Sequence, residues 1–338
     1  MVALVKIGIV VIGRNEGDRL AKCFASLPVG VPTIYIDSGS SDDSLALAER
    51  NGIPAILLCS PPNHTAARAR NAGLAWLRLN CPEVTYVMLV DGDCQLSAGW
   101  LALAQHTLDN NAGLGLVFGR RREQFPHLSI YNRLCDLEWD CPIGEALTAG
   151  GDIFCRIDAI TAIGGYRASM IAGEDPDMAC RLRTDGWKIR RLDADMTVHD
   201  AAIRHFSQWW KRTQRGGHAF AELAHFHPSI DAPDWQRQCN SIIAWGGIFP
   251  LLVLISLLFG TIFGYSWFVA NALLASIWLL QMARLTIKRR DLPMRLSIAN
   301  SWFLLVGKIP QLSGMIQYGM ARLSGRNSHL IEYKIDPR

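Results

Sequence analysis

The sequence predicts a mixed α/β domain with a mostly parallel sheet, followed by helices that associate with a membrane. Two observations lead to this fold class. In the first part of the chain, short apolar runs typical of buried strands alternate with segments of helical pattern. In roughly the last 100 residues charges are sparse, and two long runs carry none. The chain has 338 residues, enough for one large or two ordinary domains.

Composition narrows the classes of function. The net charge is +4, which suits contact with an anionic membrane or a phosphorylated ligand and is too small to indicate a nucleic-acid partner. None of the nine cysteines forms a CxxC pair, which favours reduced thiols in a cytosolic compartment. The opening apolar run lacks a small-residue cleavage site, so we expect a first strand there and not a signal peptide.

A strand–helix unit repeats along the N-terminal region. The predicted strands are 7–12, 31–36, 55–59 and 84–90, and the predicted helices are 18–27, 43–51 and 63–79. This order indicates parallel strands whose carboxyl ends share one crevice. Ser40, Ser41 or Asp42 can cap the helix after the second strand, whereas Asp37 lies too early to do so and is a candidate ligand contact.

Asp91 and Asp93 follow the fourth predicted strand and are the central candidates. Two carboxylates separated by one glycine can face a single divalent cation, and oxygen ligands suit Mg²⁺ or Mn²⁺, ions that also hold substrate phosphates. The alternative is a simple Asp-Gly turn. The sequence has neither G-x-G-x-x-G nor a Walker loop, the usual motifs of dinucleotide and P-loop proteins.

Five segments occur in the order and spacing of one known family. They are VVIGRNEG (10–17), YIDSGSSDDS (35–44), ARARNAGL (67–74), LVDGDC (89–94) and AGEDPDMACRLRTDGWKI (172–189). In these segments, which span roughly residues 5 to 200, the sequence resembles the family 2 glycosyltransferases with their Rossmann-like GT-A fold. The resemblance implies that a sugar is transferred from a nucleotide-sugar with inversion at the sugar.

The resemblance also implies which residues hold the donor. Base and ribose would lie near the loops after the first two strands, and Asp91 and Asp93 would form the DxD pair on the metal–diphosphate. A Gly-rich strand within 147–156 would contact the donor sugar. The residues implied for nucleotide-sugar binding are Asn15, Glu16, Asp37, Arg70, Asp91, Gly150, Gly151 and Asp152.

Asp175 is the general base that the resemblance implies, and Glu174 is its rival. Both open a predicted helix, 175–185, where free N–H groups and the helix dipole favour ionised carboxylates. A carboxylate on the wall opposite the metal can accept the proton of an acceptor hydroxyl. The alternative is an ordinary acidic first turn.

Aromatic residues beside carboxylates indicate where an acceptor binds. Trp139 and Asp140 end a predicted helix, 131–140, and such a pair can hold a sugar ring, although core packing of the tryptophan is an equal alternative. Arg120, Arg121 and Arg122 end a predicted strand, 114–120, and face either phosphates or solvent.

After the predicted strand 187–192, His199 lies where some GT-A enzymes have a histidine that completes the metal's coordination, so the resemblance makes it a candidate third metal ligand. A neutral imidazole suits Mn²⁺ better than Mg²⁺, and the alternative is a loop histidine held by Asp200. Residues 204–226 combine Trp209 and Trp210 with basic residues, as membrane-interface helices do. This segment is similar to the family's QxxRW element, from which its order departs, and it places both tryptophans on the acceptor side. The pair at 216–217, both glycine, predicts a bend.

Two uncharged runs, 242–260 and 265–282, are each close to the roughly 20 residues that cross a bilayer. Basic residues flank both ends, which places the catalytic domain and tail on the cytoplasmic side of the inner membrane. We expect 297–320 to be an interfacial helix, and the alternative for this segment is a third transmembrane span. For all three segments, the alternative is a buried helical core of a soluble protein. The predicted boundaries are 1–203 (catalytic domain), 204–240 (interface helix and linker), 241–285 (transmembrane hairpin) and 286–338 (basic loop, interfacial helix and tail).

The sequence therefore predicts a glycosyltransferase that depends on Mn²⁺ or Mg²⁺. It would move a sugar from a UDP- or GDP-sugar to a lipid-linked or glycan acceptor at the cytoplasmic membrane face. A nucleotidyltransferase is one alternative, although the loop GRNEG (13–17) is too acidic to cradle a triphosphate well. A non-catalytic membrane scaffold is another, although it would be expected to lose Asp91, Asp93 or Asp175, and all three are present.

Overall fold

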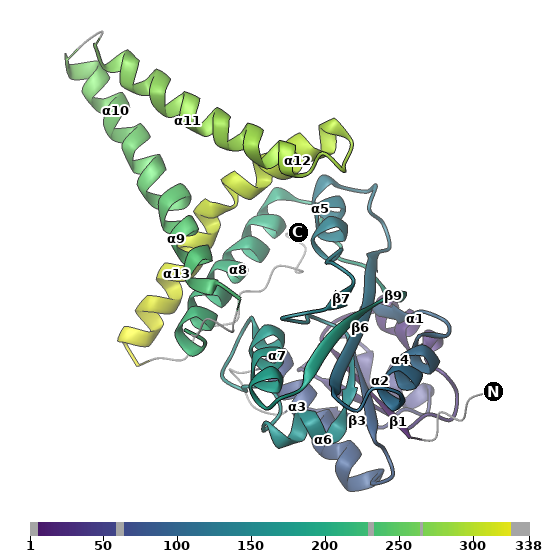
Figure 1. The fold of residues 1–338 in the computed structure, drawn as a ribbon. Coiled ribbons are helices and arrows are strands. Elements are labelled where there is room, and N and C mark those ends of the chain that lie inside the picture. The colour runs from purple at the N-terminus through teal and green to yellow at the C-terminus, as the bar shows by residue number, and fades with distance from the viewer. Residues whose placement is uncertain (1–5, 59–63, 229–232, 264–265, 326–338) are drawn as a thin grey trace.

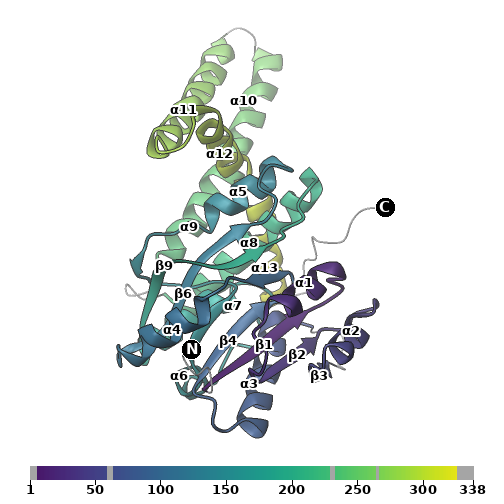
Figure 2. The same ribbon diagram turned by 90° about the vertical axis from the view of Figure 1, so that its right-hand side faces the viewer.

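The structure is a computed structural model that describes residues 6–58, 64–228, 233–263 and 266–325. Residues 6–203, the sheet domain, form one sheet with helices on both faces (Figure 1). In residues 204–325, the helical tail, all elements among the described residues are helices, and two of them form an arm that projects away from the sheet domain in Figure 1 and Figure 2.

Within the described residues the sheet has nine strands. They are β1 (Ile7–Gly13), β2 (Thr33–Asp37), β3 (Ala55–Leu57), β4 (Tyr86–Asp91), β5 (Cys94–Leu96), β6 (Leu114–Glu123), β7 (Gly144–Glu145), β8 (Ile153–Arg156) and β9 (Lys188–His199). Their order is β3-β2-β1-β4-β8-β6-β9-β5, and β7 pairs with β9. The strands β3, β2, β1 and β4 are parallel, which confirms the prediction for the first half of the sheet.

The second half of the sheet is mixed. Strand β8 is antiparallel to β4 and to β6, and β5 is antiparallel to β9. The chain enters β8 from the carboxyl edge of the sheet, and a parallel strand would have required a crossover back to the opposite edge. The predicted strand 187–192 is also too short, because β9 continues to His199. His199 therefore ends a strand and does not lie in a loop.

Seven helices of the sheet domain are α1 (Asp18–Ser26), α2 (Ser44–Arg50), α3 (Ala66–Asn80), α4 (Trp100–Asp109), α5 (Ile130–Glu138), α6 (Ile157–Ala162) and α7 (Glu174–Thr184). Figure 1 shows α3, α6 and α7 on one face of the sheet and α1, α2 and α4 on the other. Since both faces are covered, the central strands are apolar on both sides and appear in the sequence as continuous runs.

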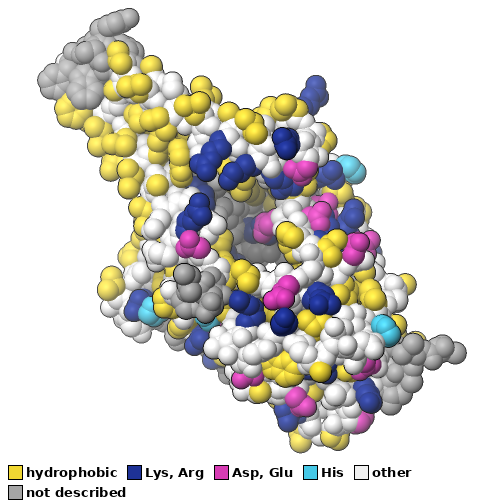
Figure 3. Space-filling view, viewed as in Figure 1, with side chains coloured by type: hydrophobic (Ala, Val, Ile, Leu, Met, Phe, Trp, Pro, Cys, Tyr) yellow, Lys and Arg dark blue, Asp and Glu magenta, His cyan; other side chains and the backbone are white. Residues whose placement is uncertain are grey.

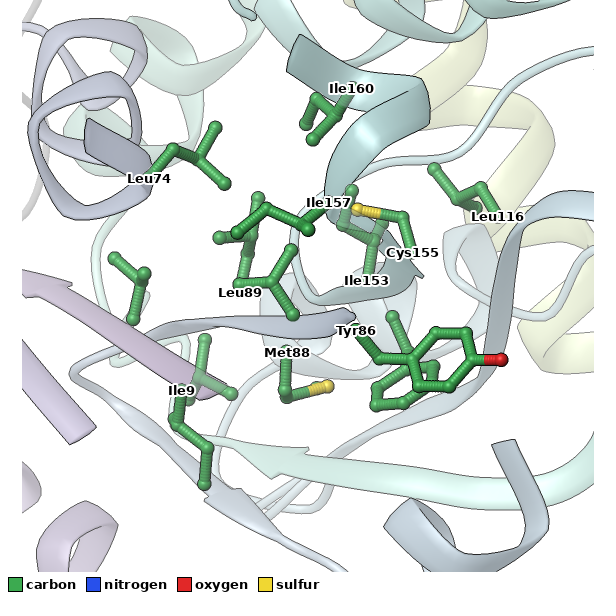
Figure 4. Close-up of a cluster of buried hydrophobic side chains, with 14 of the residues drawn as sticks. Ile9, Leu74, Tyr86, Met88, Leu89, Leu116, Ile153, Cys155, Ile157 and Ile160 are labelled. Atoms are coloured by element: carbon green, nitrogen blue, oxygen red, sulfur yellow. The ribbon is translucent and has the colours of Figure 1, made fainter. Parts of the chain in front are cut away.

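The core between sheet and helices is visible in Figure 4. On one face, Leu89 of β4 meets Leu74 from α3 and Ile160 from α6, and all three are buried. Tyr86 and Met88 point to the opposite face, as the two-residue period of a strand requires. This packing fixes the carboxyl end of β4, where Asp91 emerges.

The helical tail comprises α8 (Phe206–Phe226), α9 (Trp235–Ile243), a π-helical turn η1 (Ala244–Ile248), α10 (Phe249–Phe263), α11 (Ser266–Lys288), α12 (Met294–Val306) and α13 (Lys308–Leu323). Residues 297–320 thus belong to two helices and not to the single helix predicted. Pro310 lies in the first turn of α13, where no intrahelical N–H bond is needed, so it begins a helix instead of kinking a longer one.

Helices α8 and α13 cross at very close range. A Cβ atom at Gly217 would lie 1.9 Å from the carbonyl oxygen of Gln311, and one at Gly314 would lie 2.0 Å from that of Gln214. Helix α8 runs unbroken through Gly217. Gly217 allows the backbones of α8 and α13 to touch.

Two segments are long and apolar enough to cross a bilayer by length and composition. They are Trp235–Ile262, with 28 residues, and Val269–Lys288, with 20 residues, and the most apolar windows within them have mean hydropathies of 2.5 and 1.3. Only 17% and 0% of their most apolar windows are buried. Figure 3 shows the apolar side chains of this arm on the surface. A buried core of a soluble protein, the alternative considered above, does not fit this exposure.

Candidate active site

The loops after β1 and β2 are joined by side chains. Asp37 is fully buried and accepts hydrogen bonds from the backbone N–H groups of Gly39 (2.8 Å) and Ser40 (2.7 Å) and from the Tyr35 hydroxyl (2.9 Å). Asn15, with φ 56°, accepts from the N–H of Ser41 at 2.7 Å. Asp37 thus shapes the predicted base-binding loop from within.

Glu16 follows in the same loop and forms an ion pair at 2.9 Å with Arg19, three residues later in the chain. Its side chain is only 10% exposed. Because β1 and β2 are parallel and in register, with Gly13 opposite Asp37, these loops share one edge of the sheet. Three of the predicted donor contacts, Asn15, Glu16 and Asp37, therefore lie together.

Asp91 ends β4 beside these loops and is held by two arginines. Arg70 of α3 lies 2.9 Å from one carboxylate oxygen, and Arg121 of β6 lies 3.1 Å from the other. The Asp91 side chain is 25% exposed, whereas both arginines are nearly buried. Asp91 can exchange one of its two arginine partners for a metal ion, and that ion can also bind the diphosphate.

Arg121 is the residue of the Arg120–Arg122 run that faces the site. It also contacts the fully buried Asp152 at 2.9 Å, whose carboxylate accepts hydrogen bonds from Thr197 and from the backbone N–H of Asp91. Arg120 and Arg122 point to the other face, where both lie near Asp136. The two-residue period of β6 explains this split, which separates Arg121 from its neighbours.

The glycine pair 150–151 divides into two different environments. A Cβ at Gly151 would lie 2.1 Å from the Arg121 guanidinium, and φ there is +73°, so only glycine fits. The Gly151 N–H donates to Asp175 at 2.8 Å. Gly150 is exposed and has open space where a Cβ would be. Asp152 and Gly151 thus organise charged side chains around the predicted donor-sugar site.

Asp175 opens α7 and lies 3.2 Å from Arg70, which also binds Glu174 at 2.9 Å. Burial raises the pKa of Asp175 to about 7, and the negative charge of Glu174 adds to the shift although Arg70 opposes it. The prediction that the helix dipole keeps Asp175 ionised is therefore wrong, because the effect of burial on its pKa outweighs that of the dipole. A carboxyl with a pKa near neutrality is well matched to accept and release a proton.

Asp93 and His199 form the second part of the acidic centre. Nε2 of His199 lies 3.1 Å from Asp93, and Nδ1 lies 3.8 Å from Glu123. Burial lowers the pKa of His199, which favours the neutral, metal-binding imidazole. Cys94 is near both, but burial raises the pKa of its thiol, so it stays protonated. Carboxylate oxygen and neutral imidazole together fit Mn²⁺.

The four predicted acceptor-side residues separate into two groups. Trp139 is partly exposed, stacks under Arg121 at 5.7 Å and meets the His199 ring edge-on at 4.8 Å, while Asp140 is exposed. Trp209 is buried, 5.0 Å from the Phe303 ring, in the contact between the sheet domain and α12. Its burial leaves no free face for a sugar. Trp210 is partly exposed.

A buried carboxylate that sequence reasoning missed anchors α7. Asp177 is fully buried and binds Arg181 at 2.9 Å and Arg167 at 3.2 Å. His227, just after α8, lies 2.9 Å from it. These contacts join the helix that carries Asp175 to the helical tail. The only signal in the sequence is the unusual density of acids in EDPD (174–177).

Parts of the chain are similar in sequence to known proteins. Residues 8–140 match the model for glycosyl transferase family 2. The chain is 29% identical over 245 residues to the pre-mycofactocin glycosyltransferase of Mycobacterium tuberculosis, which covers 67% of this chain and 49% of that protein. It is 32% identical over 108 residues to an uncharacterised glycosyltransferase of Mycobacterium bovis, covering 32% of this chain and 45% of the relative. The chain spans about half the length of the curated relatives that it matches.

One solved structure resembles most of the chain. It is the mannosyltransferase PcManGT from Pyrobaculum calidifontis in complex with GDP-Man and Mn²⁺, with a TM-score of 0.60 and 16% sequence identity, covering 91% of this chain and 87% of that one. This likeness concerns the fold, and the family match concerns the sheet domain that contains Asp91 and Asp93. Together they identify residues 8–140 as a glycosyl transferase family 2 domain and the fold of the chain as GT-A.

Proposed function

We propose that this chain transfers a sugar from a nucleoside-diphosphate sugar to an acceptor at a membrane, in one displacement with inversion. The observation that carries the proposal is the convergence of Asp91, Asp93 and Asp175 with Arg70 and Arg121 at the carboxyl edge of the sheet. Ligands bind at this edge in open α/β sheets. A scaffold or a nucleotidyltransferase would not need a carboxylate of raised pKa opposite the acidic pair.

Asp175 is proposed as the base. Its pKa of about 7 leaves a large fraction ionised at neutral pH, and the partner N–H of Gly151 fixes one of its oxygens. The other oxygen is buried 3.2 Å from Arg70 and accepts no hydrogen bond from the described residues, so it has the capacity to accept one from the acceptor hydroxyl. Glu174 is the weaker candidate, because it already accepts a hydrogen bond from Arg70 at 2.9 Å.

The leaving diphosphate is proposed to lie between the arginines and the acidic pair. Asp91, Asp93 and His199 would hold a divalent cation, which supplies Lewis-acid stabilisation of the departing charge. Arg70 and Arg121 orient Asp91 and bring two further positive charges to the same place. Glu123, 3.8 Å from Nδ1 of His199, would fix the orientation of the imidazole.

The donor is proposed to be a UDP- or GDP-sugar, in line with the GDP-Man bound to the Pyrobaculum mannosyltransferase. The acceptor is proposed to be lipid-linked or a glycan near the bilayer. Support comes from the apolar arm α10–α11, where large side chains such as Leu254, Leu258 and Leu280 are exposed. Basic residues near both ends of the arm's base favour the cytoplasmic face of the inner membrane.

A thermal-shift screen of the detergent-purified full chain tests this proposal. The ligands are UDP, GDP, CMP and dTDP, each with and without Mn²⁺. A ligand at a hundredfold excess over its Kd stabilises the fold by about 2.7 kcal/mol, which is easily measured. We expect a manganese-dependent shift with one nucleotide, which also names the donor class.

The double variant Asp91→Ala/Asp93→Ala should lose this shift. Its matched control is Asp193→Ala/Asp195→Ala, which removes two exposed carboxylates with the same spacing from β9. A normal metal-dependent shift in the first variant, or an equal loss in the control, would show that the acidic pair does not hold the metal–diphosphate.

A further inference from the structure

The helical tail contains a basic cavity of about 630 Å³, open to the surface, between α9, α11 and the junction of α12 with α13. Four cationic side chains line it: Arg237, Arg284, Lys288 and Lys308. Every described residue that lines the cavity lies between 233 and 308, so none comes from the sheet domain. The cavity is therefore separate from the residues of the active site.

The charge of this cavity is uncompensated. None of the four cations forms an ion pair with another described residue. The one acidic lining residue, Asp234, uses a carboxylate oxygen to accept the backbone N–H of Arg237 at 2.8 Å. Burial lowers the pKa of Lys308, because its ammonium is partly removed from water there. Four cations around one cavity are complementary to an anion such as a phosphate.

An apolar groove continues from the basic cavity. Its volume is about 330 Å³, and Trp245 and Leu305 line both spaces. Phe249, Val253 and Trp278 line the rest of the groove, which contains no charged side chain among its lining residues. Figure 1 places these residues' helices, α10 and α11, along the two sides of an open V. A polar cavity joined to an apolar groove fits an amphiphile.

The cavity also lies at the depth where a lipid headgroup would be. The segment Trp235–Ile262 has 28 residues, about 42 Å of helix at 1.5 Å per residue, and exceeds a hydrocarbon core of about 30 Å. Its first residues, including Arg237, must then lie outside the core. Arg284 and Lys288 are near the end of α11 on the same side. Figure 3 shows basic side chains gathered between the apolar arm and the sheet domain.

We propose that this cavity binds the phosphate headgroup of a membrane lipid, with a hydrocarbon chain of that lipid in the adjoining groove. The site lies apart from the catalytic carboxylates, so the lipid held there anchors and orients the helical tail. The proposal rests on the membrane association proposed above. Phosphatidylglycerol and a polyprenyl phosphate share the chemistry required, namely a phosphate next to an apolar chain.

Native mass spectrometry of the detergent-solubilised full chain tests the site. Four probes are titrated: phosphatidylglycerol, phosphatidylcholine, a polyprenyl phosphate and glycerol 3-phosphate. In Arg284→Gln/Lys308→Gln we expect phosphatidylglycerol affinity to fall about thirtyfold, since each cation near a lipid phosphate contributes about fivefold. The matched control Arg290→Gln/Arg295→Gln removes the same charge from exposed positions that do not line the cavity, and should change affinity less than about threefold.

The four probes distinguish between the possible sources of the phosphate. Tighter binding of the polyprenyl phosphate than of phosphatidylglycerol would identify a phosphomonoester lipid as the occupant, and comparable binding would identify bilayer phospholipid. Both bind more tightly than glycerol 3-phosphate if the groove holds a chain. Equal loss of affinity in the two variants, or equal binding of phosphatidylcholine and phosphatidylglycerol by the unaltered chain, would overturn the proposal.

Two further readouts keep this result apart from the proposed function. The manganese-dependent nucleotide shift should persist in both variants, which shows that each is folded and that its active site is intact. Flotation of the full chain with phosphatidylcholine vesicles tests membrane association alone. A chain that floats but binds lipids without selectivity refutes the cavity only, whereas a chain that does not float refutes the membrane part of the proposed function.

Discussion

Replacing Asp175 with asparagine removes the proposed base while keeping the size of the side chain. General-base catalysis contributes about 10²–10⁴ in rate, so we expect kcat to fall by at least about a hundredfold. The nucleotide should still bind, because the diphosphate contacts are assigned to Asp91, Asp93 and the arginines. Asp185→Asn, at the exposed C-terminal cap of the same helix, is the matched control and should keep full activity.

The pKa of Asp175 turns this prediction into a pH profile. With a pKa of about 7, the carboxylate is about one-eleventh ionised at pH 6 and about ten-elevenths ionised at pH 8. The rate of the unaltered chain at saturating substrates should therefore rise about tenfold between these values and then level off. Initial rates of nucleoside-diphosphate release give the profile directly.

Stability should follow pH in the opposite sense. The folded-state pKa of Asp175 lies above its ordinary value of 3.8, so the folded chain binds this proton more tightly than the unfolded chain. The stabilisation is complete below about pH 4 and is lost as the pH rises through about 7. Asp175→Asn should flatten this slope in thermal unfolding. A flat rate profile in the unaltered chain, or more than about a tenth of its activity in Asp175→Asn, would refute the assignment.

Two glycine substitutions test close contacts, each with a control glycine nearby. Gly151→Ala should destabilise the fold by about 1–3 kcal/mol and displace Arg121, whose guanidinium would lie 2.1 Å from the new Cβ, whereas a Cβ at Gly150 contacts nothing. Thermal unfolding measures the change in stability, and donor hydrolysis measures the effect on the active site. Equal behaviour of Gly151→Ala and Gly150→Ala would contradict the structure. Gly314→Ala should lower the unfolding temperature in detergent by forcing α13 from α8, whereas Gly319→Ala, with open space at its Cβ, should raise stability by up to about 1 kcal/mol through helix propensity; a stabilising Gly314→Ala would argue against the crossing.

The first half of the fold was predictable because its signals are local. The strands ending at Gly13, Asp37 and Asp91 are continuous apolar runs followed at once by polar loops, and the structure places them parallel and in register. The mixed half was not predictable in this way. The antiparallel direction of β8 depends on the edge at which the chain re-enters the sheet, and no short pattern in the sequence records that edge.

The site was predictable in its residue types but less so in its partners. Asp91, Asp93 and Asp175 carry recognisable spacing, whereas Arg121 is indistinguishable in the sequence from the arginines on either side. Only the strand's two-residue alternation, combined with the position of Asp152, identifies it. The raised pKa of Asp175 likewise results from burial by distant segments, which a local argument from a helix terminus does not include.

The close crossing of α8 and α13 has a consequence for the order of synthesis. Helix α8 leaves the ribosome directly after the sheet domain, but the surface that contacts its Gly217 belongs to α13, roughly 80 residues later. At about 5–20 residues per second, α8 is without that partner for about 4–16 seconds. Both apolar helices emerge during this interval. The sheet domain can therefore fold early, whereas α8, tied to α7 through His227 and Asp177, reaches its final packing only after the apolar arm has been made.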